Sequence, residues 1–296
     1  MQNTLPFYKV YPGGNPTILV WDNALFALHD FPEKRRSLAA QLMQEGHLGA
    51  EQVGFLDTSR ALPHLEMMGG EFCVNAIRSA ALVFAHMGLV TPTATPPEGY
   101  QQEWLGDITA SGADEPVQVR VRKHAKAADY ETALSVALPC MNMKAARELI
   151  HKKDAGEIVV CLPGITHILL DSRLFPLPED PIAASSAIRK KYTTGKEDAV
   201  GVIWYGSLPG TTVLWITPVV HVAATCSSVA ETACGSGSLA LALWIAVTTG
   251  STTATIRQPS GFCMGVAFEQ QKEKLYAWVD GSTRLFAEGM AHIVQE

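Results

Sequence analysis

Hydrophobic and polar residues alternate over many short segments of the chain, which predicts strands more often than helices. The alternation is clearest in VQVRVRK (117–123), where every second residue is apolar. The opening FYKVYPGGNPTILVWD has apolar residues on both sides of the turn residues 12–16, which predicts strand, turn, strand. EIVVCLPGITHILLD (157–171) repeats that arrangement. Further strands are predicted at EQVGFLD, HLEMM, ETALSVALP, AVGVIWYG and TTVLWITPVV.

Four segments predict helices. After Cys73, VNAIRSAALVFAHMG has alanines and apolar residues three and four positions apart, and Gly88 ends the pattern. The others are 31–44, 183–192 and the segment that Cys234 opens. Residues 91–116, rich in Thr, Pro, Gly and Gln, are expected to be a loop with short strands. TTATIRQPSGFCMGVAFEQ and KLYAWVDGSTRLFAEGMAHIV are each expected to be a strand pair joined by turn residues.

The order of these elements is repeated. Residues 14–20 match residues 164–170 in spacing, and a cysteine stands at a helix start twice, at Cys73 and Cys234. A repeat this long predicts an α+β fold of two pseudo-symmetric lobes, each a mixed β-sheet or barrel around a central helix. We place one lobe at residues 1–117 with 272–296, carrying Cys73, and the other at 118–271, carrying Cys234. The active site is then expected where the lobes meet.

Composition narrows the classes of function. Of 296 residues, 47 % are hydrophobic and 18 % charged, which is enough apolar material for a substantial core. The net charge of −6 and the scattered basic residues argue against a nucleic-acid partner. No signal peptide is visible, and the longest apolar run, Leu239 to Val247, is about half the length that crosses a bilayer. We therefore expect a soluble, cytoplasmic protein with no membrane partner.

Six cysteines occur, but none forms a C-x-x-C pair, and no H-E-x-x-H pair occurs, so no metal site is expected. Disulfides are not expected in a chain of this kind. Cys140, Cys161, Cys226 and Cys263 are expected to be structural thiols, mostly filling the core.

The stretch ETACGSGSLALALW (231–244) places Cys234 at a glycine turn that opens an apolar helix. A thiol at a helix start faces unpaired backbone N–H groups and the positive end of the helix dipole, which favour the thiolate. The same N–H groups can hold a carboxylate. Cys73 with Val74 and Asn75 offers the same combination in the other half. Two such sites suit racemisation by two bases, in which one thiolate removes the α-proton and an opposing thiol returns one, without pyridoxal phosphate or another cofactor.

The motifs GGEFCVNA (69–76) and ETACGSGS (231–238) resemble those of the diaminopimelate epimerase-like fold, whose members carry C-G-N-[GA] and ET-x-AC-G-[TS]-G at these places. The resemblance covers most of the chain. NPTILV, EQVGF, EFCVNA, CGSGS and QPSG are similar, more closely, to the histidine racemases of opine-type (staphylopine-type) metallophore biosynthesis. This resemblance implies a cofactor-independent isomerase that interconverts L- and D-histidine. Its partner would be a small-molecule amino-acid substrate, and its assembly a homodimer.

The departures from the family pattern argue against diaminopimelate as substrate. No arginine lies between Arg189 and Arg257, so the clamp for a distal carboxylate is missing, and Gly201 stands in place of an asparagine of that clamp. Val74 replaces the usual glycine, although its backbone N–H is retained. The Glu-Thr pair that begins at Glu231 also lies one residue nearer to Cys234 than in the family pattern.

The resemblance implies roles residue by residue. Cys73 and Cys234 form the acid/base pair, while backbone groups of Val74, Asn75, Gly235 and Ser236 hold the carboxylate. The remaining implied contacts are Asn15 and Gln52 to the substrate head, Glu51, Glu71 or Glu231 to its ammonium or imidazole, and His167 in the lining of the site.

Three alternatives stay open. The first is a racemase or epimerase of another α-amino acid, and the second is a binding protein on this scaffold that does not exchange the α-proton. The third is a phenazine-biosynthesis type of isomerase, against which the cysteine pair counts. A dinucleotide site at residues 235–240, which fit G-x-G-x-x-A, is excluded because no acid follows between Thr232 and Phe268.

Overall fold

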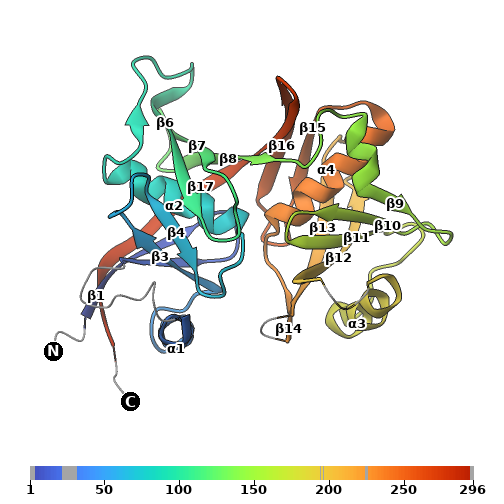
Figure 1. The fold of residues 1–296 in the computed structure, drawn as a ribbon, viewed down its shortest axis with the longest axis horizontal. Helices are drawn as coiled ribbons and strands as arrows, with labels where there is room; N and C mark the ends of the chain where they lie inside the picture. Colours follow the sequence, from blue (N-terminus) through green and yellow to red (C-terminus); the bar gives the residue numbers. More distant parts are fainter. Residues whose placement is uncertain (1–3, 22–31, 194, 196, 224–225, 294–296) are drawn as a thin grey trace. The chain divides into compact units, whose positions relative to one another are not determined.

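The structure, a computed structural model, describes residues 4–21, 32–193, 195, 197–223 and 226–293. These residues form an α+β fold that is mostly sheet, with four α-helices (Figure 1). The chain divides into two compact units, Met1–Leu134 with Asp280–Glu296 and Ser135–Val279. β8 and β17 each contribute residues to both units, so the change of unit falls inside strands and not in loops.

The first unit contains most of the elements of the N-terminal half. They are β1 (Thr4–Tyr11), β2 (Thr17–Trp21), α1 (Pro32–Met43), β3 (Gln52–Asp57), β4 (His64–Met67), α2 (Val74–His86), β5 (Thr91–Pro92), β6 (Tyr100–Ala110), β7 (Val117–His124) and β8 (Tyr130–Ala137).

The second unit contains the remaining elements. They are the 3₁₀ helix η2 (Ala145–Leu149), β9 (Ile150–Lys152), β10 (Ile158–Leu162), β11 (Ile165–Asp171), α3 (Pro181–Tyr192), β12 (Ala199–Ser207), β13 (Leu214–Val222), β14 (Ser227–Ala230), α4 (Gly235–Thr249), β15 (Thr253–Arg257), β16 (Cys263–Gln271) and β17 (Lys274–His292).

The two units share one order of strand pairing. In the first, β1 pairs antiparallel with β2, β2 parallel with β3, β3 antiparallel with β4, β4 parallel with β6, and β6 antiparallel with β7. In the second, β10, β11, β12, β13, β15 and β16 pair in the same sequence of directions. Each parallel pair needs a crossover, and a helix lies in each one: α1 and α2 in the first unit, α3 and α4 in the second.

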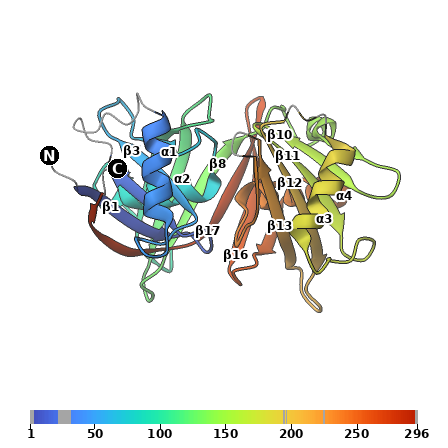
Figure 2. The ribbon, with the colours of Figure 1, turned by 90° about the horizontal axis from the view of Figure 1, so that it is seen from below.

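Each unit has one helix on each face of its strands. Successive strand residues point to opposite faces, so Ile18, Val20, Val53 and Phe55 pack against α1 while Leu19 and Gly54 face the other way, toward α2. In the second unit Val200, Val202 and Trp204 pack against α3, and Ile203 lies beside Gly237 of α4. Figure 1 shows α3 and α4 on opposite sides of β10–β13, and Figure 2 shows α1 along one face of the first unit.

The helices α2 and α4 form the centres of their units. Val74 to Ala85 of α2 are all buried, and α2 contacts β1, β2, β3, β4, β6 and β7. A helix that is buried on all sides is enclosed by other elements, and alanines such as Ala80 and Ala81 let the strands approach closely. In the part of the chain that the structure describes, no helix is long and apolar enough to cross a membrane.

Two elements differ from the sequence prediction. Residues 91–116, expected to be a loop with short strands, contain the eleven-residue strand β6, which pairs with β7 from Tyr100↔His124 to Ile108↔Val117. The segment expected to be a strand pair from Lys274 onward is one strand, β17, because its second half pairs with β1 over Thr4↔His292 to Tyr11↔Arg284. The other predicted helices and strands are present, although the start of the first helix at residue 31 lies outside the described residues. The short elements η2, β9 and β14 are not among the predicted elements.

A fully buried arginine, Arg78, ties α2 to the surrounding strands. Its guanidinium donates to the carbonyl oxygens of Pro12 (3.2 Å), Thr132 (3.1 Å) and Ser282 (3.1 Å). It also donates to Thr283 Oγ1 at 3.3 Å and Asn75 Oδ1 at 3.5 Å. Burial lowers the pKa of Arg78 to about 10, and the charges of Asp280 and Glu131 oppose that shift. Hydrogen bonds from one side chain thus hold four separate chain segments together.

In the second unit, His167 of β11 is fully buried. It faces Gly201, where an added Cβ would lie 2.2 Å from His167 Nδ1, so only glycine leaves room for the imidazole. Neither ring nitrogen has a hydrogen-bond partner among the described residues. Burial lowers the pKa of His167 to about 3.

We predict that Arg78→Met lowers the free energy of unfolding by about 3 kcal/mol, because buried carbonyl oxygens lose their donors. Urea unfolding followed by circular dichroism measures the change. Arg60→Met, which removes a half-exposed ion pair with Asp57, is the control and should shift stability by less than about 1 kcal/mol. Equal stability of Arg78→Met and the parent protein would show that the buried network is unimportant.

The buried His167 predicts acid sensitivity. Its pKa is about 3 in the folded chain, but about 6.5 when unfolded, so the unfolded state binds a proton at pH values between these two. Stability therefore rises with pH, and it falls by about 2 kcal/mol from pH 7 to pH 5 through this one group. We predict that His167→Leu removes that part of the pH dependence in urea unfolding measured at both pH values. An unchanged pH dependence would contradict burial of a neutral imidazole.

Candidate functional site

The two cysteines of the predicted acid/base pair occupy the same local position. Cys73 is the N-cap residue of α2 with φ −128° and ψ 109°, and Cys234 is the N-cap residue of α4 with φ −132° and ψ 104°. An N-cap residue has extended backbone, and the first N–H groups that follow it lie outside the helix's own hydrogen-bond ladder. Each central helix therefore presents a thiol together with backbone donors at its start.

Cys73 is connected to the β1–β2 turn by a chain of side-chain hydrogen bonds. Its thiol donates to Gln52 Oε1 at 3.2 Å, Gln52 Nε2 donates to Thr17 Oγ1 at 2.7 Å, and Thr17 Oγ1 donates to the Asn15 carbonyl at 2.9 Å. Gln52 and Thr17 face each other because β2 and β3 pair in parallel with Thr17↔Gln52 in register. Three of the first unit's predicted site residues, Cys73, Gln52 and Asn15, therefore belong to one network.

Asn15 is held in an unusual backbone conformation. Its φ is +49°, next to Gly13 at +81° and Gly14 at +141°, and only 5 % of Asn15 is exposed. Asparagine tolerates this left-handed region better than most residues because its side chain bonds locally. Arg78 holds the start of the same turn through the Pro12 carbonyl. The turn is thus braced from α2 on one side and from Thr17 on the other.

The acids of the first unit differ in their surroundings. Burial raises the pKa of the Glu71 carboxyl, backbone hydrogen bonds from Glu71 itself and Gly69 oppose the rise, and the charge of Glu66 adds to it. Glu66 bonds to Arg35 (3.2 Å) and His64 (3.2 Å). Glu51 is exposed, and its backbone N–H donates to the Pro16 carbonyl at 2.9 Å. Glu71, two residues before Cys73, is therefore a partly buried acid, unlike the exposed Glu51.

Cys234 is almost completely buried, at 3 % exposed. Its Sγ accepts from the Gly237 N–H at 3.3 Å and lies 3.6 Å from Ser236 Oγ. Burial raises the pKa of the Cys234 thiol well above its ordinary value, the Glu231 carboxylate raises it further through its charge and a hydrogen bond, and Ser236 and Gly237 act in the lowering direction. The expectation that the helix start lowers this pKa is wrong, because desolvation and Glu231 outweigh the two lowering hydrogen bonds.

The remaining predicted residues lie at the two helix starts, just before the start of α4, or inside the second unit. Val74 and Asn75 form the buried first turn of α2, and Gly235 and Ser236 form the first turn of α4. Glu231 stands three residues before Cys234, and its backbone N–H donates to the Pro218 carbonyl at 3.1 Å. His167 lies inside the second unit, on the α4 face of β11, and its role in lining the site stays a prediction.

Sequence reasoning missed the buried Thr17, which links Gln52 to the turn. Its hydroxyl sits in an apolar strand, TILVW, and a single polar residue at a strand start carries little signal by itself. The register of β2 against β3 reveals its role. It also missed Ser111, whose Oγ donates to the Glu71 carbonyl at 3.0 Å and accepts from the Met67 N–H at 2.9 Å.

Of the other four cysteines, Cys161 packs against a hydrophobic core cluster but none is fully buried, which corrects the expectation that most of them fill the core. Cys226 and Cys263 are exposed, and Cys140 and Cys161 are half-buried. The structure describes all six cysteines, and none forms a disulfide. Among the described residues, no group of three or more His, Cys, Asp or Glu side chains is arranged to hold a metal ion.

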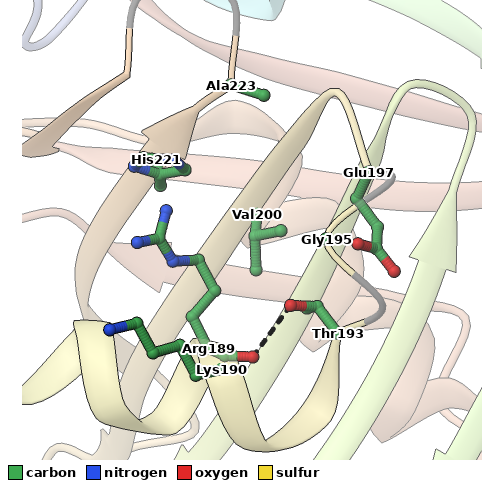
Figure 3. A pocket seen from close by; sticks show the side chains of 8 residues that line it. All are labelled: Arg189, Lys190, Thr193, Gly195, Glu197, Val200, His221 and Ala223. Carbon is green, nitrogen blue, oxygen red and sulfur yellow. Dashed lines mark hydrogen bonds between the residues drawn. The ribbon is translucent and has the colours of Figure 1, made fainter.

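A cavity of about 390 Å³ in the second unit is lined by neither Cys73 nor Cys234 (Figure 3). It lies at the C-terminal end of α3 and on the sheet face opposite to α4, because its lining residue Val200 belongs to the hydrophobic cluster that packs against α3. Burial lowers the pKa of His221, and the charge of the neighbouring Arg189 lowers it further. The lining residues are Arg189, Lys190, Thr193, Gly195, Glu197, Val200, His221 and Ala223. None of them is a predicted site residue.

The fold is similar to those of several solved structures. A phenazine biosynthesis protein of the PhzF family from Bacillus anthracis superposes with a TM-score of 0.59 at 9 % identity, covering 98 % of this chain and 99 % of that one. A predicted epimerase from Pseudomonas aeruginosa gives 0.56 at 11 % identity, covering 99 % and 100 %. At these identities the likeness concerns the fold alone.

Sequence comparison is more specific. A histidine racemase from Fusobacterium nucleatum subsp. nucleatum is 29 % identical over 290 residues, 98 % of this chain and 97 % of that protein. A histidine racemase from Staphylococcus aureus is 40 % identical over 82 residues, which cover 26 % of this chain and 28 % of that protein. The family described as the histidine racemase CntK N-terminal domain matches residues 4–292. The chain therefore belongs to the histidine racemase family, and it is an isomerase of the racemase type.

Proposed function

We propose that this protein interconverts L- and D-histidine without a cofactor, with Cys73 and Cys234 as its two bases. The observation that carries the proposal is the repeated placement of the thiols. In each of two units with the same order of strand pairing, a cysteine with extended backbone caps the enclosed central helix. A fold built only for stability has no need of a cysteine at both positions, since capping favours Ser, Thr, Asp or Asn.

The proposed reaction moves one proton on each face of the substrate α-carbon. The thiolate of one cysteine takes the α-proton and becomes a thiol, leaving a carbanion whose charge spreads onto the carboxylate. The thiol of the other cysteine gives its proton to the opposite face and becomes the thiolate. Proton count and charge balance, and the enzyme is left ready for the reverse reaction.

The helix starts supply the stabilisation that this step needs. Backbone N–H groups at Val74, Asn75, Gly235 and Ser236 would meet the negative charge that develops on the carboxylate. Glu231 and Glu71, which precede the two cysteines, would accept hydrogen bonds from the ammonium or the imidazole. We further propose the two-lobe, diaminopimelate epimerase-like arrangement, in which each lobe contributes one of the two cysteines.

The raised pKa of Cys234 bears on the protonation of this thiol before the reaction. Burial beside the Glu231 carboxylate favours the protonated form of the Cys234 thiol. We infer that Cys234 is the acid when the Cys73 thiolate removes the α-proton, and that the two roles exchange when the opposite enantiomer is bound. Bound substrate changes this balance, because its ammonium neutralises a nearby carboxylate charge.

The most direct test is exchange of the α-proton in heavy water, followed by NMR for each L-amino acid. We expect exchange and inversion with histidine. Exchange with a different amino acid would change the substrate assignment. Binding of histidine without exchange would favour a binding protein and end the enzymatic proposal.

We predict that Cys73→Ala and Cys234→Ala each lower the rate of racemisation at least 100-fold, about the contribution of one general acid or base. The remaining thiol should still exchange the α-proton of one enantiomer, and the two variants should differ in which one. Cys263→Ala, which changes an exposed thiol of the second unit, is the control with full activity. Full activity in either of the first two variants would remove that cysteine from the mechanism.

We also predict that Glu231→Gln shifts the alkylation of Cys234 by iodoacetamide to lower pH, because one of the causes that raise its pKa disappears. Peptide mass spectrometry after short exposures at several pH values gives the profile without any substrate. Glu179→Gln, an exposed acid just before α3 on the other face of the sheet, is the control. An unchanged profile in Glu231→Gln would show that this carboxylate does not act on the thiol.

A further inference from the structure

Gln258 directly follows β15, and its side chain points into the second unit. It is 3 % exposed and lies in the tight turn before β16, where its N–H donates to the Phe262 carbonyl (2.8 Å) and its carbonyl accepts from the Gly261 N–H (2.9 Å). The turn is stabilised by Gly261 at φ +86°. Backbone hydrogen bonds and Gly261 are therefore sufficient to form the turn, and the buried side-chain amide of Gln258 makes its hydrogen bonds to residues outside it.

That amide closes a ring of hydrogen bonds around Cys234. Gln258 Oε1 accepts from the Cys234 backbone N–H at 2.9 Å, and Gln258 Nε2 donates to Ser238 Oγ at 2.9 Å. Ser238 Oγ donates to the Cys234 carbonyl at 2.7 Å. The second Nε2 hydrogen goes to the Ile256 carbonyl at 3.0 Å. Both donors of the amide are used, and all three residues of the ring are buried.

The ring holds both peptide groups of Cys234. The Cys234 carbonyl also accepts the first backbone hydrogen bond of α4, from the Ser238 N–H at 3.0 Å. The Sγ atom of Cys234 accepts from the Gly237 N–H. With the N–H held by Gln258 and the carbonyl by Ser238, the backbone has little freedom to turn the thiol. A displacement of about 1 Å at a reacting group costs on the order of 100-fold in rate.

In the first unit, the cysteine at the helix start is held by a different set of hydrogen bonds. Ser111 follows β6 as Gln258 follows β15, since β6 and β15 are the matching strands, but Ser111 bonds to Met67 and Glu71 and not to Cys73. Cys73 is held instead at its sulfur, by Gln52. A change at Gln258 should therefore affect one of the two thiols and leave the other in place.

We propose that Gln258 is a positioning residue that holds Cys234 at the geometry for proton transfer. The proposal rests on the function proposed above, in which Cys234 is one of two bases. It assigns a role to a residue that does not touch the reacting carbon and acts through the backbone of the residue that does.

The test uses Gln258→Met, which keeps the length of the side chain and removes the hydrogen bonds. We expect kcat for racemisation to fall at least about 10-fold with little change in KM. In heavy water, α-proton exchange should fall for the enantiomer that Cys234→Ala also loses and persist for the other. Gln270→Met, which removes an exposed amide in the same unit, should behave as the parent protein. Equal loss for both enantiomers in a folded variant, or no loss at all, would overturn the proposal.

A second readout needs no substrate and is independent of the proposed reaction. The alkylation rate of Cys234 relative to Cys73 should rise several-fold in Gln258→Met, because the loosened helix start exposes the buried thiol. An unchanged ratio would refute the positioning role even if the protein acts on no amino acid. If Gln258→Met is not recovered folded, Ser238→Ala removes another side chain of the ring. The α-proton exchange of each enantiomer and the alkylation ratio of Cys234 to Cys73 are then measured in that variant, and the same results support or refute the proposal.

Discussion

The structure depends on enclosing an α-helix on every side, which leaves the polar groups at the start of that helix to be satisfied by other residues. The flanks of α2 and α4 are mostly apolar and small residues, a polar side chain such as Arg78 is buried there with hydrogen-bond partners, and the helix backbone satisfies its own polar groups. The N-terminus is the exception, because its first N–H groups have no partner within the helix. A cysteine placed there is surrounded by donors that the fold itself provides.

This constraint explains why so much hydrogen bonding gathers around the two helix starts. Arg78 ties the strands and the β1–β2 turn to α2, and Gln52 reaches from the start of β3 to the Cys73 thiol. In the second unit Gln258 and Ser238 surround the backbone of Cys234. Buried polar groups are costly unless each is paired, so these networks stabilise their own geometry as well as that of the thiols.

The two halves have the same topology and different chemistry at matching places. In the first unit, Thr17 of β2 and Gln52 of β3 form a hydrogen-bonded pair. At the matching register positions of β11 and β12, the imidazole of His167 instead faces Gly201, which has no side chain. One thiol is hydrogen-bonded at its sulfur to an amide, and the other is buried beside a carboxylate. Such unequal surroundings are what a pair of groups needs if one is to act as the acid while the other acts as the base.

The sequence alone determined most of the local structure and the presence of a cysteine at the start of each central helix. Periodicity and turn residues indicated the four helices and most strands, and the repeated cysteines at helix starts indicated where to look for chemistry. Tertiary structure decided the rest. β17 is one strand and not two because β1 pairs along it, and β6 forms in a Thr- and Gln-rich segment because β7 supplies its partner. The pKa of Cys234 follows from burial and from Glu231, and the roles of Thr17, Arg78 and Gln258 follow from residues distant in the chain. Hydrogen bonds and desolvation depend on distances between such residues, which no local pattern in the sequence records.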